Sequence, residues 1–251
     1  MRAGNTAVRF KLRFMHCAND EARMTVSCLR RLALSTSTCL LAALVLFAPA
    51  AWADPAADML LELRHGWEVA RYQSPAGNRG RLFAALAAKA QVAADLLPGR
   101  AEPLVWQGMA LSAQAEEEGW LGVWTKYQLT HQARALFESA LQADGGVLDG
   151  AAYIGLGMLY YKSPPWPLGF GSKRRAGELL QQALALHPGA IDPNFFYGEY
   201  LLETRKSDEA VAYLQKALQL PIRPGYQVTD TGRREEIRAL LSQAQERQAQ
   251  R

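Results

Sequence analysis

The residues best able to do chemistry are the three histidines that follow residue 53, and their spacing forms no catalytic or metal-binding motif. His65, His131 and His187 lie in different segments, and no pair has the His-x-x-x-His spacing that sets two imidazoles on one helical face. The glycine segments Gly145-Gly146 and Gly169-Phe170-Gly171 lack the strand-turn-helix setting of a phosphate-binding loop. We therefore expect a protein that is not an enzyme and that uses no cofactor and no metal.

The first 53 residues have the layout of a secretory signal peptide behind an N-terminal extension. Basic Arg30-Arg31 is followed by an apolar run over 40–47 and by Ala51-Trp52-Ala53, a small-x-small cleavage site. We expect cleavage after Ala53 and a periplasmic protein. An uncleaved membrane anchor, for which the apolar segment is about long enough, and a secreted protein are the alternatives. Residues 1–23 lie upstream of the leader, and a start codon placed too early is the favoured explanation for them.

Removing this segment changes two bulk properties of the chain. All three cysteines, Cys17, Cys28 and Cys39, would be lost, so no disulfide or thiolate site could form. Residues 1–53 hold 7 of the 28 Lys and Arg and 2 of the 24 Asp and Glu, which leaves 21 basic and 22 acidic residues and a net charge of about −1. Nucleic-acid binding needs a basic face on the folded domain, so we expect no nucleic-acid partner.

From Asp54 onward the composition and the apolar spacing favour helices. Ala, Leu, Gln and Glu dominate, and apolar residues recur at three- and four-residue steps, as they do over 211–218. Pro188-Gly189 is typical of a helix end. Asp192-Pro193 reads as an N-cap followed by proline in the first helical turn, and Ser172 and Ser207 read as further N-caps.

Small residues recur at fixed spacing along this helical part. Gly198 precedes Ala210 by twelve residues, and Leu214 and Ala217 follow at steps of four and three. This resembles the tetratricopeptide repeat (TPR), in which small residues let two antiparallel helices approach closely. A second good copy, with seven extra residues between its helices, contains the corresponding residues Gly157, Ala176, Leu180 and Ala183. Two poorer copies contain Gly108, Ala133, Phe137 and Ala140, and Leu86, Ala90 and Ala93.

The resemblance implies an all-α fold, a TPR-like α-solenoid of antiparallel helix pairs with inserted loops and a C-terminal capping helix. We expect an N-terminal extension and signal peptide over 1–53 and a degenerate helix pair over 54–100. TPR-like repeats are expected over 101–221, at about 101–146, 150–189 and 191–221. A C-terminal loop and capping helix are expected over 222–251.

TPR arrays bind partners along the concave surface lined by the first helix of each pair, and the resemblance places that groove here by register. Methionine, tyrosine and phenylalanine on such a surface can bury an extended peptide or a partner helix. The alternative for each residue is packing against neighbouring helices without binding. The candidate groove residues are Val105, Met109, Ile154, Met158, Tyr161, Lys162, Asp192, Phe195 and Glu199.

The inserted segments are the second candidate site. Residues 163–171 carry three prolines together with Trp166 and Phe170, and residues 116–130 carry Trp120 and Trp124 at helical spacing. The longer insertion could form an extra helix that lies over the repeats. Loops on a rigid scaffold often carry binding, but packing of these aromatic side chains against the solenoid is the favoured interpretation.

The expected function is a non-catalytic scaffold of the cell envelope that binds another protein or peptide. Residues 166–171 and 191–198 resemble a group of exported bacterial TPR proteins described as accessories of TonB-type transport. The alternative is a small-ligand-binding accessory protein that resembles the T component of TRAP transporters, whose stacked helices enclose a pocket. Contact with a membrane is expected only through an uncleaved leader.

Overall fold

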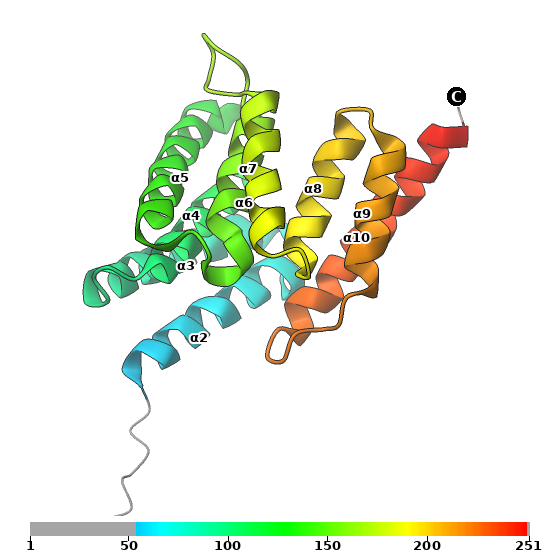
Figure 1. Ribbon diagram of the computed structural model, residues 1–251. Helices are drawn as coiled ribbons and strands as arrows, with labels where there is room; N and C mark the ends of the chain where they lie inside the picture. Colours follow the sequence, from blue (N-terminus) through cyan, green and yellow to red (C-terminus); the bar gives the residue numbers. More distant parts are fainter. Residues whose placement is uncertain (1–53, 250–251) are drawn as a thin grey trace, which may run out of the picture. The chain divides into compact units, whose positions relative to one another are not determined.

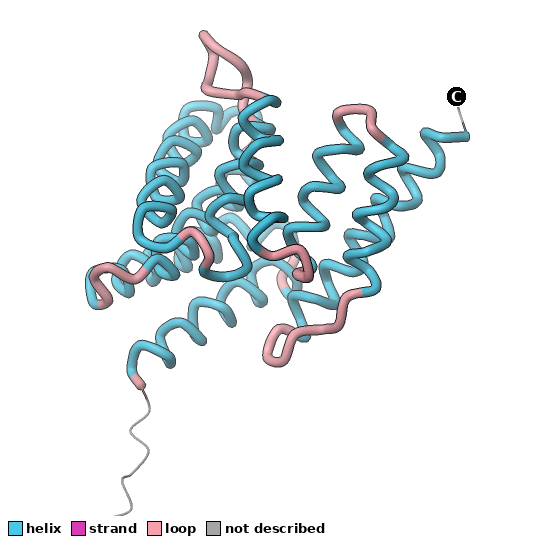
Figure 2. The backbone as a smooth tube through the Cα atoms, in the orientation of Figure 1, coloured by secondary structure: helices cyan, strands magenta, loops and turns pink. Residues whose placement is uncertain are grey.

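The computed structural model describes residues 54–249, and all of its regular structure in that range is helical (Figures 1 and 2). The expected leader and the three cysteines lie outside the described residues. No helix within 54–249 is both long and apolar enough to span a bilayer. The elements are α2 (Pro55–Glu68), the π-helical turn η1 (Val69–Gln73), α3 (Ala76–Leu96), α4 (Ala101–Glu117), the 3-10 turn η2 (Trp120–Gly122), α5 (Val123–Asp144), α6 (Val147–Lys162), α7 (Lys173–Leu186), α8 (Ile191–Glu203), α9 (Ser207–Gln219) and α10 (Gln227–Ala249).

The helices form consecutive antiparallel pairs that stack into a solenoid. The pairs α4/α5, α6/α7 and α8/α9 each pack closely, and each pair also contacts the next (Figure 1). The first helices of the pairs, α4, α6 and α8, lie beside one another. This arrangement confirms the TPR-like α-solenoid expected from the sequence. Each pair buries its apolar face against the neighbouring pair, so the pairs share one core.

Glycines at the expected positions explain the close approach within two pairs. A Cβ at Gly157 would lie 3.0 Å from Leu180 Cγ and 3.3 Å from the backbone oxygen of Ala176. A Cβ at Gly198 would lie 2.8 Å from Leu214 Cγ. Since Leu180 and Leu214 are fully buried, a larger residue at either glycine would force the paired helices apart.

The N-terminal helix begins at a well-formed cap and packs on the first clear repeat. The carboxylate of Asp54 accepts a hydrogen bond from the backbone N–H of Ala56 at 3.0 Å. At the other end of α2, the Trp67 ring lies 5.5 Å from Phe83 of α3 and 6.4 Å from Trp106 of α4. These aromatic contacts join α2 to the core of the repeats.

The C-terminal helix caps the last pair and also returns to the first helix. Ile237 and Ala244 are fully buried in contacts with α8 and α9, as expected for a capping helix. In addition, Glu236 of α10 accepts a hydrogen bond from Arg71 of η1 at 3.0 Å. Because the last helix contacts the first, α10 closes one side of the concave surface.

Two of the three expected N-caps are wrong. Ser172 does cap α7, since its hydroxyl accepts from the backbone N–H of Arg175 at 3.3 Å. Helix α8, however, begins at Ile191 with Ala190 as N-cap, and the carboxylate of Asp192 bonds two arginines instead. Helix α9 has Lys206 as N-cap, and Ser207 is its first residue, without a capping hydrogen bond.

The longer insertion contains no extra helix. After α4 ends at Glu117, one 3-10 turn leads into α5, which then runs without a break from Val123 to Asp144. Residues 123–130 contain neither glycine nor proline, so nothing interrupts the helix there. The insertion therefore lengthens α5 by about two turns, and its first part extends beyond the repeat core.

Candidate functional site

The concave side of the solenoid holds a cavity of about 710 Å³. Its walls come from α2, η1, α4, α5, α6, the α6–α7 loop, α8 and α10, whereas α3, α7 and α9 contribute none of the residues that line it. The floor is apolar, and its larger side chains include Met109, Ile154, Met158, Phe195 and Leu240.

Most of the groove residues expected from the sequence meet in this cavity. The residues that line it are Met109, Ile154, Met158, Lys162, Asp192, Phe195 and Glu199. Val105 does not line the cavity, because it is fully buried next to Trp106, against which Trp67 of α2 packs. Tyr161 also lies outside the cavity lining, where its ring meets Tyr200 edge to face at 6.1 Å.

The short insertion sends one aromatic side chain into the cavity wall. Phe170 lines the cavity and meets His131 at 5.1 Å and Tyr160 at 5.4 Å, in both cases edge to face. The guanidinium of Arg134 lies 4.9 Å from the same ring. Packing against the solenoid, the favoured interpretation for the insertion aromatics, is therefore correct for Phe170.

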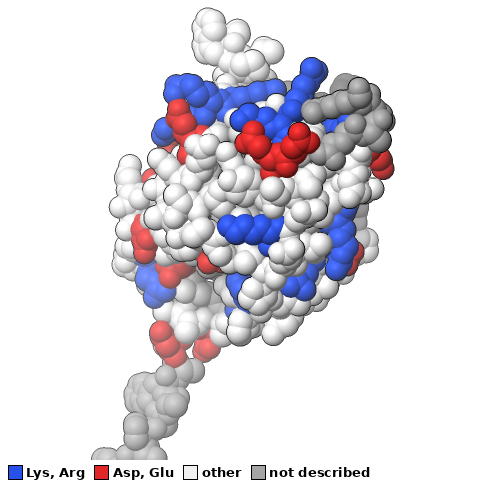
Figure 3. Space-filling view, turned by 45° about the vertical axis from the view of Figure 1, so that its right-hand side comes forward, with Lys and Arg blue, Asp and Glu red and all other residues white. Residues whose placement is uncertain are grey.

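The same interpretation is wrong for two tryptophans. Trp166 is 86% exposed at the tip of the α6–α7 loop, and Trp124 is 69% exposed near the start of α5. Trp124 stacks on Tyr127, with ring centroids 5.6 Å apart. Figure 3 shows the loop as an uncharged projection at the top of the molecule, above a band of basic side chains. The side chain of Trp120 lies outside the part that the structure describes.

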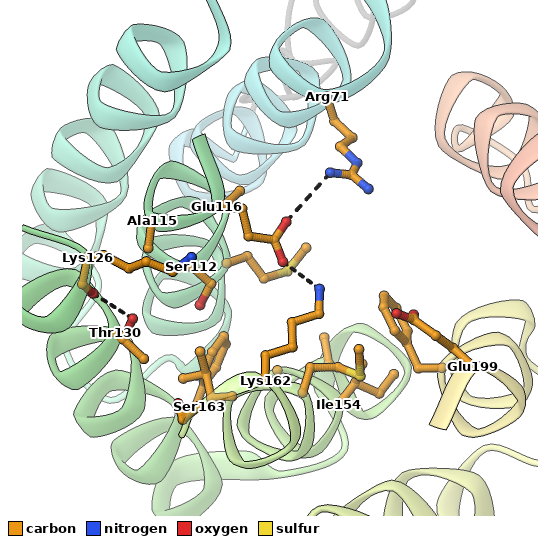
Figure 4. Close-up of a pocket in the computed structure, with 18 of the residues that line it drawn as sticks. Arg71, Ser112, Ala115, Glu116, Lys126, Thr130, Ile154, Lys162, Ser163 and Glu199 are labelled. Carbon is orange, nitrogen blue, oxygen red and sulfur yellow. Dashed lines mark hydrogen bonds and ion pairs between the residues drawn. The ribbon is translucent and has the colours of Figure 1, made fainter. Parts of the chain in front are cut away.

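A chain of ion pairs runs along the cavity wall, and no pattern in the sequence predicts it. Glu116 of α4 bonds Lys162 of α6 at 2.5 Å and lies 3.9 Å from Arg71 of η1 (Figure 4). Arg71 in turn bonds Glu236 of α10 at 3.0 Å. Because these four residues are up to 165 positions apart, only the curvature of the solenoid brings them together.

The chain continues to the start of α8. Arg233, whose side chain is 7% exposed, pairs with Glu236 and bonds Asp192 at 2.8 Å. Its guanidinium also lies over the Phe195 ring at 4.5 Å, a stabilising cation–π contact. Burial opposes ionisation of Asp192, yet Arg233 and Arg223 hold the pKa of that carboxyl below its usual value. The wall is therefore a continuous series of ion pairs from α4 to α8.

Glu199 differs from the other acids of the cavity. It projects from α8 toward the side of the cavity where Lys162 lies, and Figure 4 draws no bond to it. It makes no hydrogen bond or ion pair with any side chain in the described part of the chain. Burial raises the pKa of Glu199, and Glu116 and Glu236 add to this, while Lys162 and Arg233 oppose it. The cavity thus contains one carboxyl group whose charge is poorly compensated.

Metal binding finds no support in the described residues, among which no group of three or more His, Cys, Asp or Glu is placed to hold an ion. The histidines have different surroundings. His131 packs on Tyr127 and Phe170, and His187 lies 4.0 Å from Asp149.

The fold and the cavity define a TPR-like helical-repeat protein whose concave surface is partly closed by its last helix. No model of a protein family matches the sequence, and no curated protein matches it. Among solved structures, the crystal structure of MamA is 18% identical over 69% of this chain and 94% of that chain, with a TM-score of 0.38. Similarity at that level supports no conclusion about this chain, so the fold assignment rests on the helix pairs themselves.

Proposed function

We propose that this protein is a non-catalytic scaffold that binds a segment of another protein in the concave cavity. The observation that carries the proposal is the apolar floor formed by the first helices of three successive pairs. Burying a partner's apolar side chains on such a floor is favourable at roughly 25 cal/mol per Å². The paired charges of the wall hold the floor in place before a partner arrives, which lowers the entropy cost of binding.

The size of the cavity alone does not separate a peptide from a small ligand, because sites for small molecules span roughly 300–1,000 Å³. The apolar surface, however, continues from the floor onto the exposed rim. Val123, Tyr127 and Leu168 line the cavity and are 67%, 44% and 76% exposed, respectively. A ligand enclosed by the cavity would leave this rim in water, whereas a longer peptide or helix can cover both. The geometry therefore favours a protein segment over the TRAP-type small-ligand alternative.

Trp124 and Trp166 are proposed as outer contacts for the same partner. Each is a large aromatic side chain held on a rigid element or a proline-stiffened loop, with little packing of its own. Tryptophan is enriched among the residues that dominate the energy of protein interfaces.

The proposed location is the periplasm, reached by cleavage after Ala53. In support, the compact helical unit begins at Asp54, the residue after the expected cleavage site, and Asp54 caps the first helix of that unit. The proposed link to TonB-type transport rests on the resemblance of residues 166–171 and 191–198 alone. It predicts that the partner is a component of that transport system.

Site-specific crosslinking in living cells tests the proposal. A photoreactive phenylalanine analogue replaces Tyr127 on the cavity rim or, as a control, exposed Leu186 on the outer helix α7. We expect the rim position to give an adduct with one envelope protein, which mass spectrometry maps to one segment. Met109→Glu, which places a charge on the floor, should abolish the adduct, and Val92→Glu on the exposed face of α3 should not.

Two results would contradict the proposal. One is an adduct that forms equally well from Leu186, and the other is an adduct that survives Met109→Glu. If the crosslinks fail while a panel of metabolites raises the melting temperature of the wild type but not of Met109→Glu, the small-ligand alternative is favoured.

A further inference from the structure

We propose that the bound segment carries a lysine or arginine flanked by apolar side chains, and that Glu199 receives this cation. The inference rests on the proposed function and adds the chemistry of the partner. It follows from which charges of the cavity are already neutralised and which one is not.

The other acids of the cavity wall have cationic partners. Glu116 is bonded to Lys162 at 2.5 Å, and Glu236 is bonded to Arg71 at 3.0 Å. Asp192 is bonded to Arg233 at 2.8 Å and, in addition, to Arg223 at 3.2 Å. Glu199 alone among the cavity carboxylates lacks an ion pair with any residue of the described range 54–249.

The two cations nearest in electrostatic effect are bonded to other carboxylates. Lys162 influences Glu199, but its ammonium group points to Glu116 (Figure 4). Arg233 is held between Asp192 and Glu236 and stacks on the Phe195 ring at 4.5 Å. Moving Arg233 to Glu199 would leave the largely buried carboxylate of Asp192 without this partner, which costs more than it gains. The pair of Lys162 and Glu116 is more exposed, with 46% and 43% of the two side chains accessible, and in the structure its ammonium group is bonded to Glu116 and not to Glu199.

A cation of the partner can neutralise the carboxylate of Glu199 without breaking any ion pair of the cavity wall. It would pair with Glu199 in a half-buried setting, where a charge-assisted hydrogen bond is stronger than in water. The side chains around Glu199 on the floor, including Met158 and Phe195, are apolar, so the residues beside that cation should be apolar as well. An acidic segment is disfavoured, because Arg71, Lys162 and Arg233 are already paired and Glu199 would repel it.

Peptide selection tests the chemistry directly. Random 16-residue peptides displayed on phage are selected against residues 54–251 of the wild type, with Met109→Glu used to discard peptides that bind elsewhere. We expect the enriched peptides to share a lysine or arginine between apolar residues. Binding of the corresponding synthetic peptide should weaken about 30-fold or more on Glu199→Gln, as is usual when one partner of a desolvated charge pair is lost.

The matched control is Glu203→Gln, one turn further along α8. Glu203 is paired with Arg247 at 3.1 Å and does not line the cavity, so its replacement should leave peptide binding within about twofold of the wild type. Replacing the peptide's own lysine or arginine by norleucine should weaken binding to the wild type strongly, and should weaken binding to Glu199→Gln little further. That pattern would show that the two groups interact.

The outcomes separate this inference from the proposed function. Peptides that depend on Met109 but lack a basic residue, or that bind Glu199→Gln as tightly as the wild type, overturn the role of Glu199 and leave the cavity as a binding site. Failure to enrich any peptide that depends on Met109 counts against the cavity itself, and the inference falls with it.

Discussion

Replacing Gly198 by alanine tests how the helix pairs are held together. Gly198 lies in α8 opposite α9, and a Cβ there would sit 2.8 Å from Leu214 Cγ and 2.9 Å from Leu214 Cδ2. These distances are shorter than any that carbon atoms normally adopt. Leu214 is fully buried, so it has no open space into which it can move. The two helices must therefore separate, or Leu214 must adopt a strained rotamer.

The size of the effect follows from two opposing contributions. Overpacking of a buried site costs about 1–3 kcal/mol, whereas alanine is about 1 kcal/mol better than glycine inside a helix. We expect a net loss of about 1 kcal/mol in the free energy of unfolding, or about 3 °C in melting temperature for a domain of this size. Gly77→Ala in α3 is the matched control, because a Cβ there meets no atom within 4 Å. It should raise stability by about 0.5 kcal/mol.

Urea denaturation followed by circular dichroism measures both variants against the wild type. The expected order of stability is Gly77→Ala, then the wild type, then Gly198→Ala. A Gly198→Ala variant as stable as Gly77→Ala would show that the helices of the pair do not approach as closely as described, and it would refute the packing argument.

Three further predictions concern stability and processing. Since the pKa of Glu199 is raised above its ordinary 4.5, its ionisation destabilises the fold as pH rises through the folded-state pKa. Glu199→Gln should therefore raise the melting temperature at pH 8 and leave it unchanged at pH 4. Equal changes in melting temperature at both pH values would contradict this. Phe170→Ala should lower the free energy of unfolding by about 2 kcal/mol, because its ring packs on the solenoid. Trp166→Ala, at a site 86% exposed, should change it by less than about 0.5 kcal/mol. Urea titrations that reverse this order would be evidence against the packing described. N-terminal sequencing of the protein from a periplasmic extract should begin at Asp54, and a chain that retains residues 1–53 would exclude cleavage.

The helix pairs could be predicted from the sequence because they depend on local spacing. Gly198 and Ala210, and Gly157 and Ala176, mark contacts between helices that follow one another closely in the chain. Helical periodicity and small residues at fixed steps are sufficient to identify such contacts. For the same reason, most of the groove residues could be assigned by register.

The charged wall of the cavity could not be predicted in this way. Arg71 and Glu236 are 165 positions apart, and neither belongs to a repeating pattern. Asp192 looked like an N-cap because aspartate before proline commonly starts a helix. Its carboxylate instead forms ion pairs with Arg223, which lies in the connection between α9 and α10, and with Arg233 of α10. Such pairings depend on the curvature of the whole solenoid, which local spacing does not determine.

The exposure of the insertion aromatics was also beyond the sequence pattern. Trp124 and Tyr127 have helical spacing, which is compatible with both a buried and an exposed face. Only the length of α5 beyond the neighbouring helices determines that Trp124 remains 69% exposed.

Methyl NMR of methionine is the most direct test of partner binding in the concave cavity. Residues 54–251 contain three methionines, of which Met109 and Met158 line the cavity and Met59 on α2 does not. With ¹³C-methyl-methionine labelling, addition of a selected peptide should shift the resonances of Met109 and Met158 and leave that of Met59 in place. A bound peptide that leaves both cavity methyls unchanged would show that the partner binds elsewhere.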